Sequence, residues 1–425
     1  MIRLLYNLLW PFGLLFFLPG YLVKMFRRGG YRANFEQRFA FYDRNLRRRL
    51  REQPPIWLHA VSVGEIIIAL KLARAIRTSE PEAPLLLSTT TTTGFGFANK
   101  NALPGMDVIY TPLDFWPIMR RAFVAIRPQR IILIEAEVWP NLAAEAHTRS
   151  IPLVLVNARL SPRSERRMTQ FCFFVSPTFR LLDLVCIQEA RDAERWAALG
   201  VPSERIRHTG SIKYDPDDRT EAPGRPPYYH SAAVENLVLF GGSTHRGEEE
   251  ILARIFLKLR PQFASLSLFI APRHIERVSE IRKRLENLSH NVTLCSEKEN
   301  ASQAAPDCLL LDKTGELRRW YQMATVVFVG KSLTAHGGQN PVEPLMAGKP
   351  VIFGPNMENF AALARELVVN RAAVQVNDEK SLQEVVENLL RDPDERDRLV
   401  QNAGRVLDAH RGATMRTARL VLELQ

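Results

Sequence analysis

The sequence predicts an α/β protein made of two domains, each built on a parallel, doubly wound sheet. At 425 residues the chain exceeds one common domain and fits two of about 150–200 residues. Short apolar runs of strand length alternate with helix-length stretches through most of it. A polar, proline-rich run resembles a linker and divides this series. The predicted divisions are a membrane anchor at 1–30, a first domain at 31–214, a linker at 215–232 and a second domain at 233–425.

The beginning of the chain predicts the membrane anchor. Only Asn7 is strongly polar between Leu4 and Val23, and about 20 apolar residues suffice for a helix to cross the hydrocarbon core. Ten basic and two acidic residues follow between Lys24 and Arg51, which by the positive-inside rule places the next domain in the cytoplasm. A single span and a segment lying in the membrane interface both fit this stretch.

Composition narrows the function classes. With 46% hydrophobic and 24% charged residues, the chain is globular rather than disordered. The net charge of +11 gathers next to the predicted anchor, which favours a membrane surface over nucleic acid; the sequence has no zinc-finger or helix-turn-helix pattern. The four cysteines lack a CxxC spacing, so we interpret them as reduced core residues of a cytosolic protein.

In the first domain we expect a series of buried strands, each followed by a helix. The strands lie at 55–61, 85–87, 108–110, 131–134, 153–156 and 185–187. Ligands bind beyond the carboxyl ends of such strands, so polar residues at these positions are candidate site residues. A hydroxyl-rich run at 88–94 follows the second strand and fits either sugar binding or helix capping.

Acidic residues follow two of these strands. Glu65 stands three residues after Ser62, a spacing that fits a helix cap as well as a general base. Glu135 and Glu137 lie two residues apart, so they face the same way on a strand. We interpret Glu137 as the cap of a helix that begins near Pro140.

A basic stretch follows the strand at 153–156 and continues into an aromatic one. Its basic members are Arg159, Arg163, Arg166 and Arg167, and its apolar members are Phe171, Phe173, Phe174 and Val175. Such a stretch suits a phosphorylated lipid, but a polar loop followed by a core helix fits equally well.

Candidate functional residues stand at the start of the linker. Lys213 stands just before it, where a lysine at the hinge can face the second domain. Asp215 and Asp217 form a D-x-D pair, which holds a metal in some sugar transferases. We expect no metal here, because no histidine or further acid cluster stands at ligand spacing.

The second domain repeats the alternation, with strands expected at 237–240, 266–270, 309–311, 325–330 and 350–353. The strand ends carry a Gly-Gly turn at 241–242, Arg273 and a polar turn at 312–316. None of these is specific alone, but together they favour a nucleotide site. The helical segment 381–425 follows, and its last helix can cross back onto the first domain.

The most informative turn of this domain starts with glycines 337 and 338. We expect free backbone N–H groups there, followed by a helix with Asn340 as its N-cap, Pro341 in the first position and Glu343 three residues after the cap. Such an N-terminus suits a phosphate, and the carboxylate of Glu343 suits ribose hydroxyls. An ordinary capping box is the alternative.

Eight motifs in order resemble those of the 3-deoxy-D-manno-octulosonic acid (Kdo) transferase family. They are HAVSVGE (59–65), EAEVWPN (135–141), NARLS (157–161), GSIKYD (210–215), GSTHRGEE (242–249), APRH (271–274), KTGEL (313–317) and GGQNPVEP (337–344). The resemblance implies a GT-B glycosyltransferase with two Rossmann-like domains facing a cleft and an N-terminal membrane-anchor helix. It also implies an inverting transfer of Kdo from CMP-Kdo to a lipid A precursor, in lipopolysaccharide core biosynthesis, without a metal or another cofactor. The expected place is the cytoplasmic face of the bacterial inner membrane, in contact with its lipids.

The resemblance also implies residue roles. Glu65 would be the general base, and Glu135 and Lys213 would stabilise the transition state. CMP would lie against Pro272, Arg273, Thr314, Gly315, Glu316, Asn340, Pro341, Val342 and Glu343. Two positions depart from the pattern, since Lys331 stands where the family often has glycine and Gln339 where it often has histidine.

Two alternatives remain open from the residues themselves. One is another GT-B glycosyltransferase, or a sugar-nucleotide epimerase with the same two-domain plan. The other is a membrane-tethered scaffold that binds lipid A without catalysis, against which the intact Glu65, Arg273 and Glu343 argue.

Overall fold

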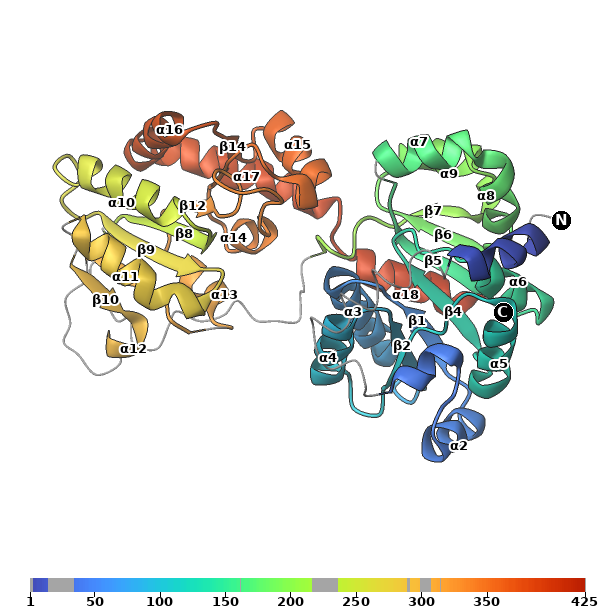
Figure 1. Cartoon of the computed structure of the whole chain (residues 1–425). Helices are drawn as coiled ribbons and strands as arrows, with labels where there is room; N and C mark the ends of the chain where they lie inside the picture. The colour runs from blue at the N-terminus through green and yellow to red at the C-terminus, as the bar shows by residue number, and fades with distance from the viewer. Residues whose placement is uncertain are drawn as a thin grey trace. The chain divides into compact units, whose positions relative to one another are not determined.

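The computed structural model describes residues 3–13, 34–160, 162–215, 236–288, 291–298, 307–313 and 315–424. The chain folds into two compact units, one of residues 1–215 and 410–425 and the other of residues 216–409. Each contains one seven-stranded sheet, and all strand pairs in both sheets are parallel (Figure 1). The predicted pair of parallel α/β domains is therefore confirmed.

The sheet of the first unit has the strand order β3-β2-β1-β4-β5-β6-β7. Its strands are β1 (Ile56–His59), β2 (Leu85–Thr89), β3 (Asp107–Tyr110), β4 (Arg130–Ile134), β5 (Leu153–Ala158), β6 (Leu184–Ile187) and β7 (Ile206–His208). The strands are nearly continuous apolar runs, as expected for a parallel sheet that helices cover on both faces.

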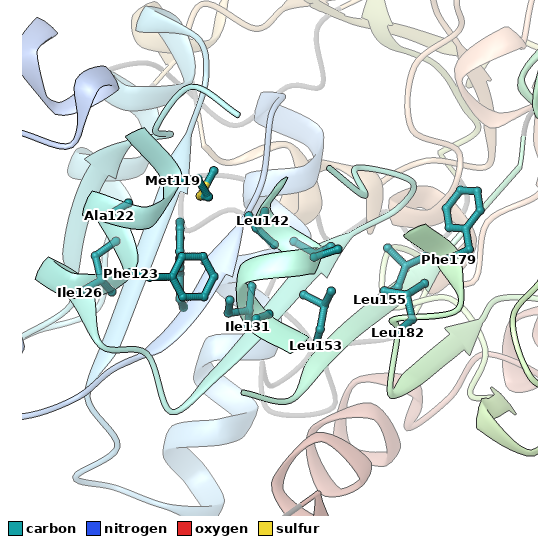
Figure 2. Packing of buried hydrophobic residues seen from close by; sticks show 14 of the residues in the cluster. Met119, Ala122, Phe123, Ile126, Ile131, Leu142, Leu153, Leu155, Phe179 and Leu182 are labelled. Atoms are coloured by element: carbon teal, nitrogen blue, oxygen red, sulfur yellow. The ribbon is translucent and has the colours of Figure 1, made fainter. Parts of the chain in front are cut away.

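Helices on the two faces of this sheet form separate cores. They are α2 (Arg44–Glu52), α3 (Val63–Ser79), α4 (Thr92–Asn101), α5 (Trp116–Ile126), α6 (Pro140–Thr148), α7 (Pro162–Gln170), α8 (Cys172–Phe179), α9 (Asp192–Ala198) and α18 (Ala413–Glu423), with the short η1 (Phe35–Phe39) and η2 (Ser203–Arg205). One core lies under α5 and α6, where Phe123 packs near Ile131 and Leu153 (Figure 2). The other lies under α3 and α18.

Helix α18 belongs to the first unit although more than two hundred residues separate it from β7. It packs beside α3 (Figure 1), and its Val421 is fully buried in the α3 core. Asp215 caps it, since its carboxylate accepts hydrogen bonds from the N–H groups of Gly412 and Thr414, both at 2.7 Å. The second unit therefore ends at 409 and not at 425, because the last helix buries its apolar face on the first sheet.

The sheet of the second unit has the order β10-β11-β9-β8-β12-β13-β14. Its strands are β8 (Val238–Thr244), β9 (Ser267–Pro272), β10 (Val292–Leu294), β11 (Cys308–Leu310), β12 (Val326–Val329), β13 (Val351–Phe353) and β14 (Val374–Gln375). Its helices are α10 (Glu248–Leu259), α11 (Val278–Asn287), α12 (Cys295–Lys298), α13 (Leu317–Tyr321), α14 (Val342–Met346), α15 (Ala361–Val369), α16 (Glu379–Arg391) and α17 (Pro393–Asp408), with η3 (Ile275–Arg277) and η4 (Glu358–Phe360).

The glycines at 241 and 242 lie inside β8, so the predicted Gly-Gly turn at this place was wrong. They are needed for close packing instead. A Cβ atom on Gly241 would lie 2.5 Å from Leu252 Cδ1, and one on Gly242 would lie 2.4 Å from the Tyr321 hydroxyl. The helix that follows begins after Gly247, whose φ of 93° is left-handed.

The predicted membrane-anchor helix is not supported. In the part of the chain that the structure describes, no helix is both long and apolar enough for a membrane crossing. Residues 3–13 form a helix, and the rest of the predicted anchor, residues 14–30, lies outside the described residues. The helix docks on the first unit through polar contacts: Arg3 bonds Asn141 at 3.0 Å and Glu145 at 2.8 Å, and Asn7 bonds Asn141 at 2.9 Å.

The chain switches from one side of the starting strand to the other between β1 and β4 in the first sheet and between β8 and β12 in the second. The connections from the two strands at such a point leave toward different sides, so a crevice opens beyond their carboxyl ends. Most of the predicted site residues follow these strands or their neighbours.

Candidate active site

Glu65 lies in the first turn of α3, beyond the carboxyl end of β1, and is only 9% exposed. Its carboxylate accepts hydrogen bonds from the Val61 N–H at 2.9 Å and from the Ser62 hydroxyl at 2.8 Å. The Ser62 hydroxyl in turn accepts from the Glu65 N–H at 3.3 Å. The predicted capping arrangement is therefore present, and it fixes the orientation of the carboxylate.

Glu135 follows β4 directly, next to β1 in the sheet. Its φ of 63° is left-handed, which is uncommon for a residue with a side chain and typical of functional positions. Burial and the charge of Glu65 raise the pKa of Glu135, while the charges of Lys213 and Arg159 lower it. The structure thus brings the three predicted catalytic residues, Glu65, Glu135 and Lys213, into one electrostatic environment.

Lys213 lies on a turn that Asn157 and Lys71, from two other parts of the first unit, hold in place. The Oδ1 of Asn157 accepts hydrogen bonds from the Ile212 N–H at 3.0 Å and from the Ser211 hydroxyl at 3.3 Å. Lys71 of α3 donates to the carbonyls of Ile212 and Asp215. Burial lowers the pKa of the Lys213 ammonium, and the nearby Glu135 opposes that shift.

Glu137 is not the cap of α6, so that interpretation was wrong. The first N–H groups of α6 instead donate to Asp114, from Asn141 at 3.0 Å and from Leu142 at 2.8 Å. Burial and the charges of Glu65 and Glu135 raise the pKa of Glu137 to about 7. Glu137 is therefore a third carboxyl group of the site.

Residues of the predicted donor site lie beyond β9, β11 and β12, strands of one sheet. Pro272 ends β9, and the Arg273 N–H donates to the Thr244 carbonyl at 3.1 Å. Arg273 itself is exposed. Gly315, with a φ of 90°, and Glu316 stand before α13. Thr314 lies outside the described residues.

The N–H groups of glycines 337 and 338 are not free, so that expectation was wrong. Gly337 donates to the Glu358 carboxylate at 2.6 Å, and Gly338 donates to the Lys331 carbonyl at 3.0 Å. Both glycines have positive φ, 115° and 66°, because the loop turns back on itself here.

Asn340 and Glu343 interact directly at the start of α14. The Asn340 amide donates to Glu343 Oε1 at 3.3 Å, and Asn340 Oδ1 accepts from the Val342 N–H at 3.1 Å. Pro341 is the N-cap residue, so α14 begins one residue later than predicted. Val342 is buried and its side chain packs inside the unit, so only its backbone is available to a ligand.

Glu248 organises this edge of the second sheet and was missed by the sequence reasoning. Its buried carboxylate accepts four backbone hydrogen bonds, from His245 at 2.8 Å, Lys331 at 2.8 Å, Ser332 at 3.0 Å and Leu333 at 3.1 Å. A capping glutamate in the first turn of α10 was visible in the sequence. Its partners 83 to 85 residues away were not.

In the described ranges, no group of three or more His, Cys, Asp or Glu side chains has a geometry that could hold a metal ion. Asp215, half of the D-x-D pair, is committed to capping α18, and Asp217 lies outside the described residues.

Comparison with known proteins gives consistent family matches. A family model described as 3-deoxy-D-manno-octulosonic-acid transferase (kdotransferase) matches residues 33–216, and one for glycosyl transferases group 1 matches residues 302–406. The 3-deoxy-D-manno-octulosonic acid transferase of Haemophilus influenzae is 32% identical over 395 residues, which cover 92% of this chain and 91% of that protein. The one of Bordetella pertussis is also 32% identical and covers 85% of this chain and 86% of its own.

Solved structures agree on the fold. The crystal structure of the glycotransferase of kitacinnamycin superposes with a TM-score of 0.55 at 16% identity, over 87% of this chain and 98% of that one. This likeness concerns the fold alone, and it agrees with the predicted GT-B plan of two α/β domains. Together with the matching relatives, it leads to one conclusion: the chain is a glycosyltransferase that belongs to the family of 3-deoxy-D-manno-octulosonic acid transferases.

Proposed function

We propose that the chain transfers Kdo from CMP-Kdo to a lipid A precursor, with inversion at the anomeric carbon and Glu65 as the general base. The observation that carries this assignment is the grouping of Glu65, Glu135 and Lys213 at the switch between β1 and β4 of the first sheet, in a chain of this family. The general base and the charged groups around it come from the first unit, and the donor site comes from the second.

In the proposed reaction, the acceptor hydroxyl attacks the anomeric carbon of the donor. The bond from that carbon to the phosphate oxygen breaks, CMP leaves, and the hydroxyl proton passes to the Glu65 carboxylate. The hydrogen bonds from Val61 and Ser62 use one lone pair on each oxygen of Glu65. A second lone pair on each oxygen is available to the acceptor hydroxyl.

Charges of opposite sign serve the two ends of the breaking bond. A carboxylate such as Glu135 favours the positive charge that develops on the sugar, and an ammonium such as Lys213 favours negative charge on the carboxylate or phosphate of the donor. Burial of both groups strengthens these interactions, because the local dielectric constant is lower than in water.

For the donor, we assign CMP to the edge of the second sheet. The exposed guanidinium of Arg273 suits the phosphate, and the Glu343 carboxylate suits the ribose hydroxyls. Pro272, Gly315, Glu316, Asn340, Pro341 and Val342 complete the proposed surface, together with Thr314. The proposed reaction uses no metal ion or other cofactor, since the arginine and lysine side chains can neutralise the leaving phosphate.

We further place the chain on the cytoplasmic face of the bacterial inner membrane. The helix at 3–13 exposes its apolar side, where Leu4, Leu8 and Phe12 are 76%, 67% and 68% exposed. Helix α8, which contacts α6, exposes Phe173 and Phe174 at 68% and 47%, next to the basic α7. An apolar surface beside basic residues suits lipids with anionic head groups.

The test is transfer of Kdo from CMP-Kdo to a tetra-acylated, bis-phosphorylated lipid A precursor in detergent micelles with EDTA. We expect a lipid product from the wild type and a loss of at least about a hundredfold in kcat for Glu65→Gln. Glu80→Gln is the control, because it changes an exposed carboxylate beside the same helix. Equal activity of both variants would show that Glu65 is only a helix cap and not the general base. Inhibition by EDTA would overturn the metal-free mechanism.

A further inference from the structure

Lys331 has a backbone conformation that is unfavourable for lysine. It stands in the loop after β12 with a φ of 58°, in the left-handed region. Glycine adopts this region without steric cost, whereas a residue with a Cβ atom does so only at a cost in stability.

The backbone of Lys331 does not require the lysine side chain. Its N–H donates to the Glu248 carboxylate at 2.8 Å, and its carbonyl accepts from the Gly338 N–H at 3.0 Å. Glycine would make both bonds equally well. The backbone therefore gives no reason for a lysine at this position, and the reason must lie in the side chain.

The side chain extends over the loop that carries the proposed donor residues. A Cβ atom added to Gly337 would lie 3.4 Å from Lys331 Nζ, so the ammonium group rests against this glycine, three residues before Asn340. Among the residues that the structure describes, no carboxylate forms an ion pair with this ammonium. It is half-buried on the fold and remains available to an anion from outside the chain.

Two histidines lie near Lys331, beside the Glu248 and Glu358 carboxylates that accept backbone hydrogen bonds from Lys331 and Gly337. His245 follows β8 and His274 follows β9, and their rings lie 5.6 Å apart. Lys331 contributes to lowering the pKa of His245, although burial is the larger cause. The Nδ1 atom of His245 is buried and has no hydrogen-bond partner within the described chain.

The positions of these groups single out one place on the sheet. β9, β8 and β12 are neighbours, and the chain switches from one side of the starting strand to the other between β8 and β12. Ligands of doubly wound sheets bind beyond the carboxyl ends of the strands at such a point. A cation without an internal partner at this point indicates an anionic ligand.

We propose that Lys331 binds the phosphate of the cytidine nucleotide through its ammonium group, as a cationic contact in addition to Arg273. The proposal rests on the donor site proposed above, and it assigns to that site a residue for which the resemblance implied no role. It explains why lysine stands where glycine would be easier to accommodate, since the ionic contact offsets the backbone cost.

Calorimetric titration of the full chain with CMP and with cytidine tests the proposal, because the two ligands differ only in the phosphate. For Lys331→Met we expect CMP to bind at least about tenfold more weakly and cytidine to bind as it does to the wild type. Lys331→Arg should stay within about threefold of the wild type. Lys331→Gly should lose CMP affinity like the methionine variant and melt at the same or a higher temperature, because the strain is gone.

Two further variants separate the possible failures. Lys380→Met removes an equally positive but exposed side chain from α16, and it should leave CMP binding unchanged.

Arg273→Gln tests the donor site itself. Weaker CMP binding by Arg273→Gln together with normal binding by Lys331→Met would overturn the Lys331 proposal alone. Loss of cytidine binding in Lys331→Met would also overturn it, since the side chain would then be structural. A wild type that does not bind CMP would overturn the donor site and this proposal together.

Discussion

At the scale of single residues, the partly buried carboxyl group of Glu137 makes stability depend on pH. Burial and two neighbouring carboxyl groups raise its pKa from the ordinary value of 4.5 to about 7. Between these two values the folded chain holds a proton that the unfolded chain has released. The stability from this group is complete below pH 4.5 and is lost as the pH rises through 7.

Replacing Glu137 with glutamine should therefore stabilise the first unit at high pH. We expect the free energy of unfolding of Glu137→Gln to exceed that of the wild type by about 2 kcal/mol at pH 8, with most of the difference gone at pH 5. Urea denaturation followed by tryptophan fluorescence at the two pH values measures it. A gain that is the same at both would show that the pKa of Glu137 is ordinary.

Asn157 holds the turn that carries Lys213, a proposed catalytic residue. Its Oδ1 is the shared acceptor of Ser211 and Ile212, and its φ of 52° sets it at the end of β5. Asn157→Ala leaves two buried donors unpaired, so we expect a loss of about 1–3 kcal/mol in stability. We also expect kcat to fall about tenfold, because the turn that carries Lys213 is released.

Steady-state kinetics separates these two effects of Asn157→Ala. A positioning role lowers kcat at saturating substrate in the fraction that is still folded, whereas a purely structural role lowers only the amount of folded protein. Ser211→Ala is the matched control, since it removes one of the two donors and leaves no buried donor unpaired. It should keep most of the activity.

At the scale of elements, the helix at 3–13 has two unlike sides. Asn7 bonds both Asn141 and the Trp116 N–H, and the Trp10 ring stacks on Phe115 with centroids 4.9 Å apart. Its other side carries the exposed leucines and Phe12. Hydrogen bonds and this ring contact thus fix the helix to the first unit and leave its apolar side exposed.

Charge on the apolar side of that helix should weaken membrane binding without unfolding the unit. We expect the double variant Leu8→Glu and Phe12→Glu to bind vesicles of zwitterionic and anionic phospholipid at least about tenfold more weakly in a flotation assay. Val369→Glu, which adds a charge at a residue that is 75% exposed in the second unit, is the control. Unchanged flotation of the double variant would show that another surface makes the membrane contact.

Elements also show where sequence patterns are reliable. Buried strands were predictable because parallel sheets need continuous apolar runs, and this property is local. Glycines were harder to interpret. Those at 241 and 242 match a turn in sequence but lie in β8, since their small size makes room for Leu252 and Tyr321. No residue near the two glycines in the sequence indicates that Leu252 and Tyr321 will pack against them.

At the scale of the whole molecule, the two segments that join the units lie side by side within the first unit. His410 Nδ1 accepts a hydrogen bond from the Ser211 N–H at 3.2 Å, and its ring lies 5.4 Å from that of Tyr214. Burial lowers the pKa of His410 from 6.5 to about 4. Its contribution to stability is therefore complete above pH 6.5 and is lost as the pH falls toward 4.

Thermal unfolding across this pH window tests whether His410 contributes stability that is lost as the pH falls. The wild type should lose stability between pH 6.5 and pH 4.5, whereas His410→Asn, whose amide oxygen can accept from Ser211 and does not titrate, should lose about 2 kcal/mol less. Scanning calorimetry of both proteins at matched ionic strength gives the comparison. Parallel curves would mean that His410 does not titrate in this range.

The two-domain plan and the positions of most candidate residues could be predicted, because strand ends mark the ligand side of such sheets. The partners that orient those residues could not. Asp114 caps α6 from 27 residues away, and Glu248 reaches the loop after β12 across 83 residues. Contacts of that range depend on how the strands order themselves, and the sequence alone does not show that order.

The return of α18 to the first sheet determines the order in which the chain can be completed during synthesis. The core behind Glu65 includes Ala418 and Val421, so the ribosome must make the entire second unit before that core can close. Until then, the apolar side of α3 remains open to water or to a chaperone. The unit that carries Glu65, although it is the first to be translated, is therefore the last to be finished.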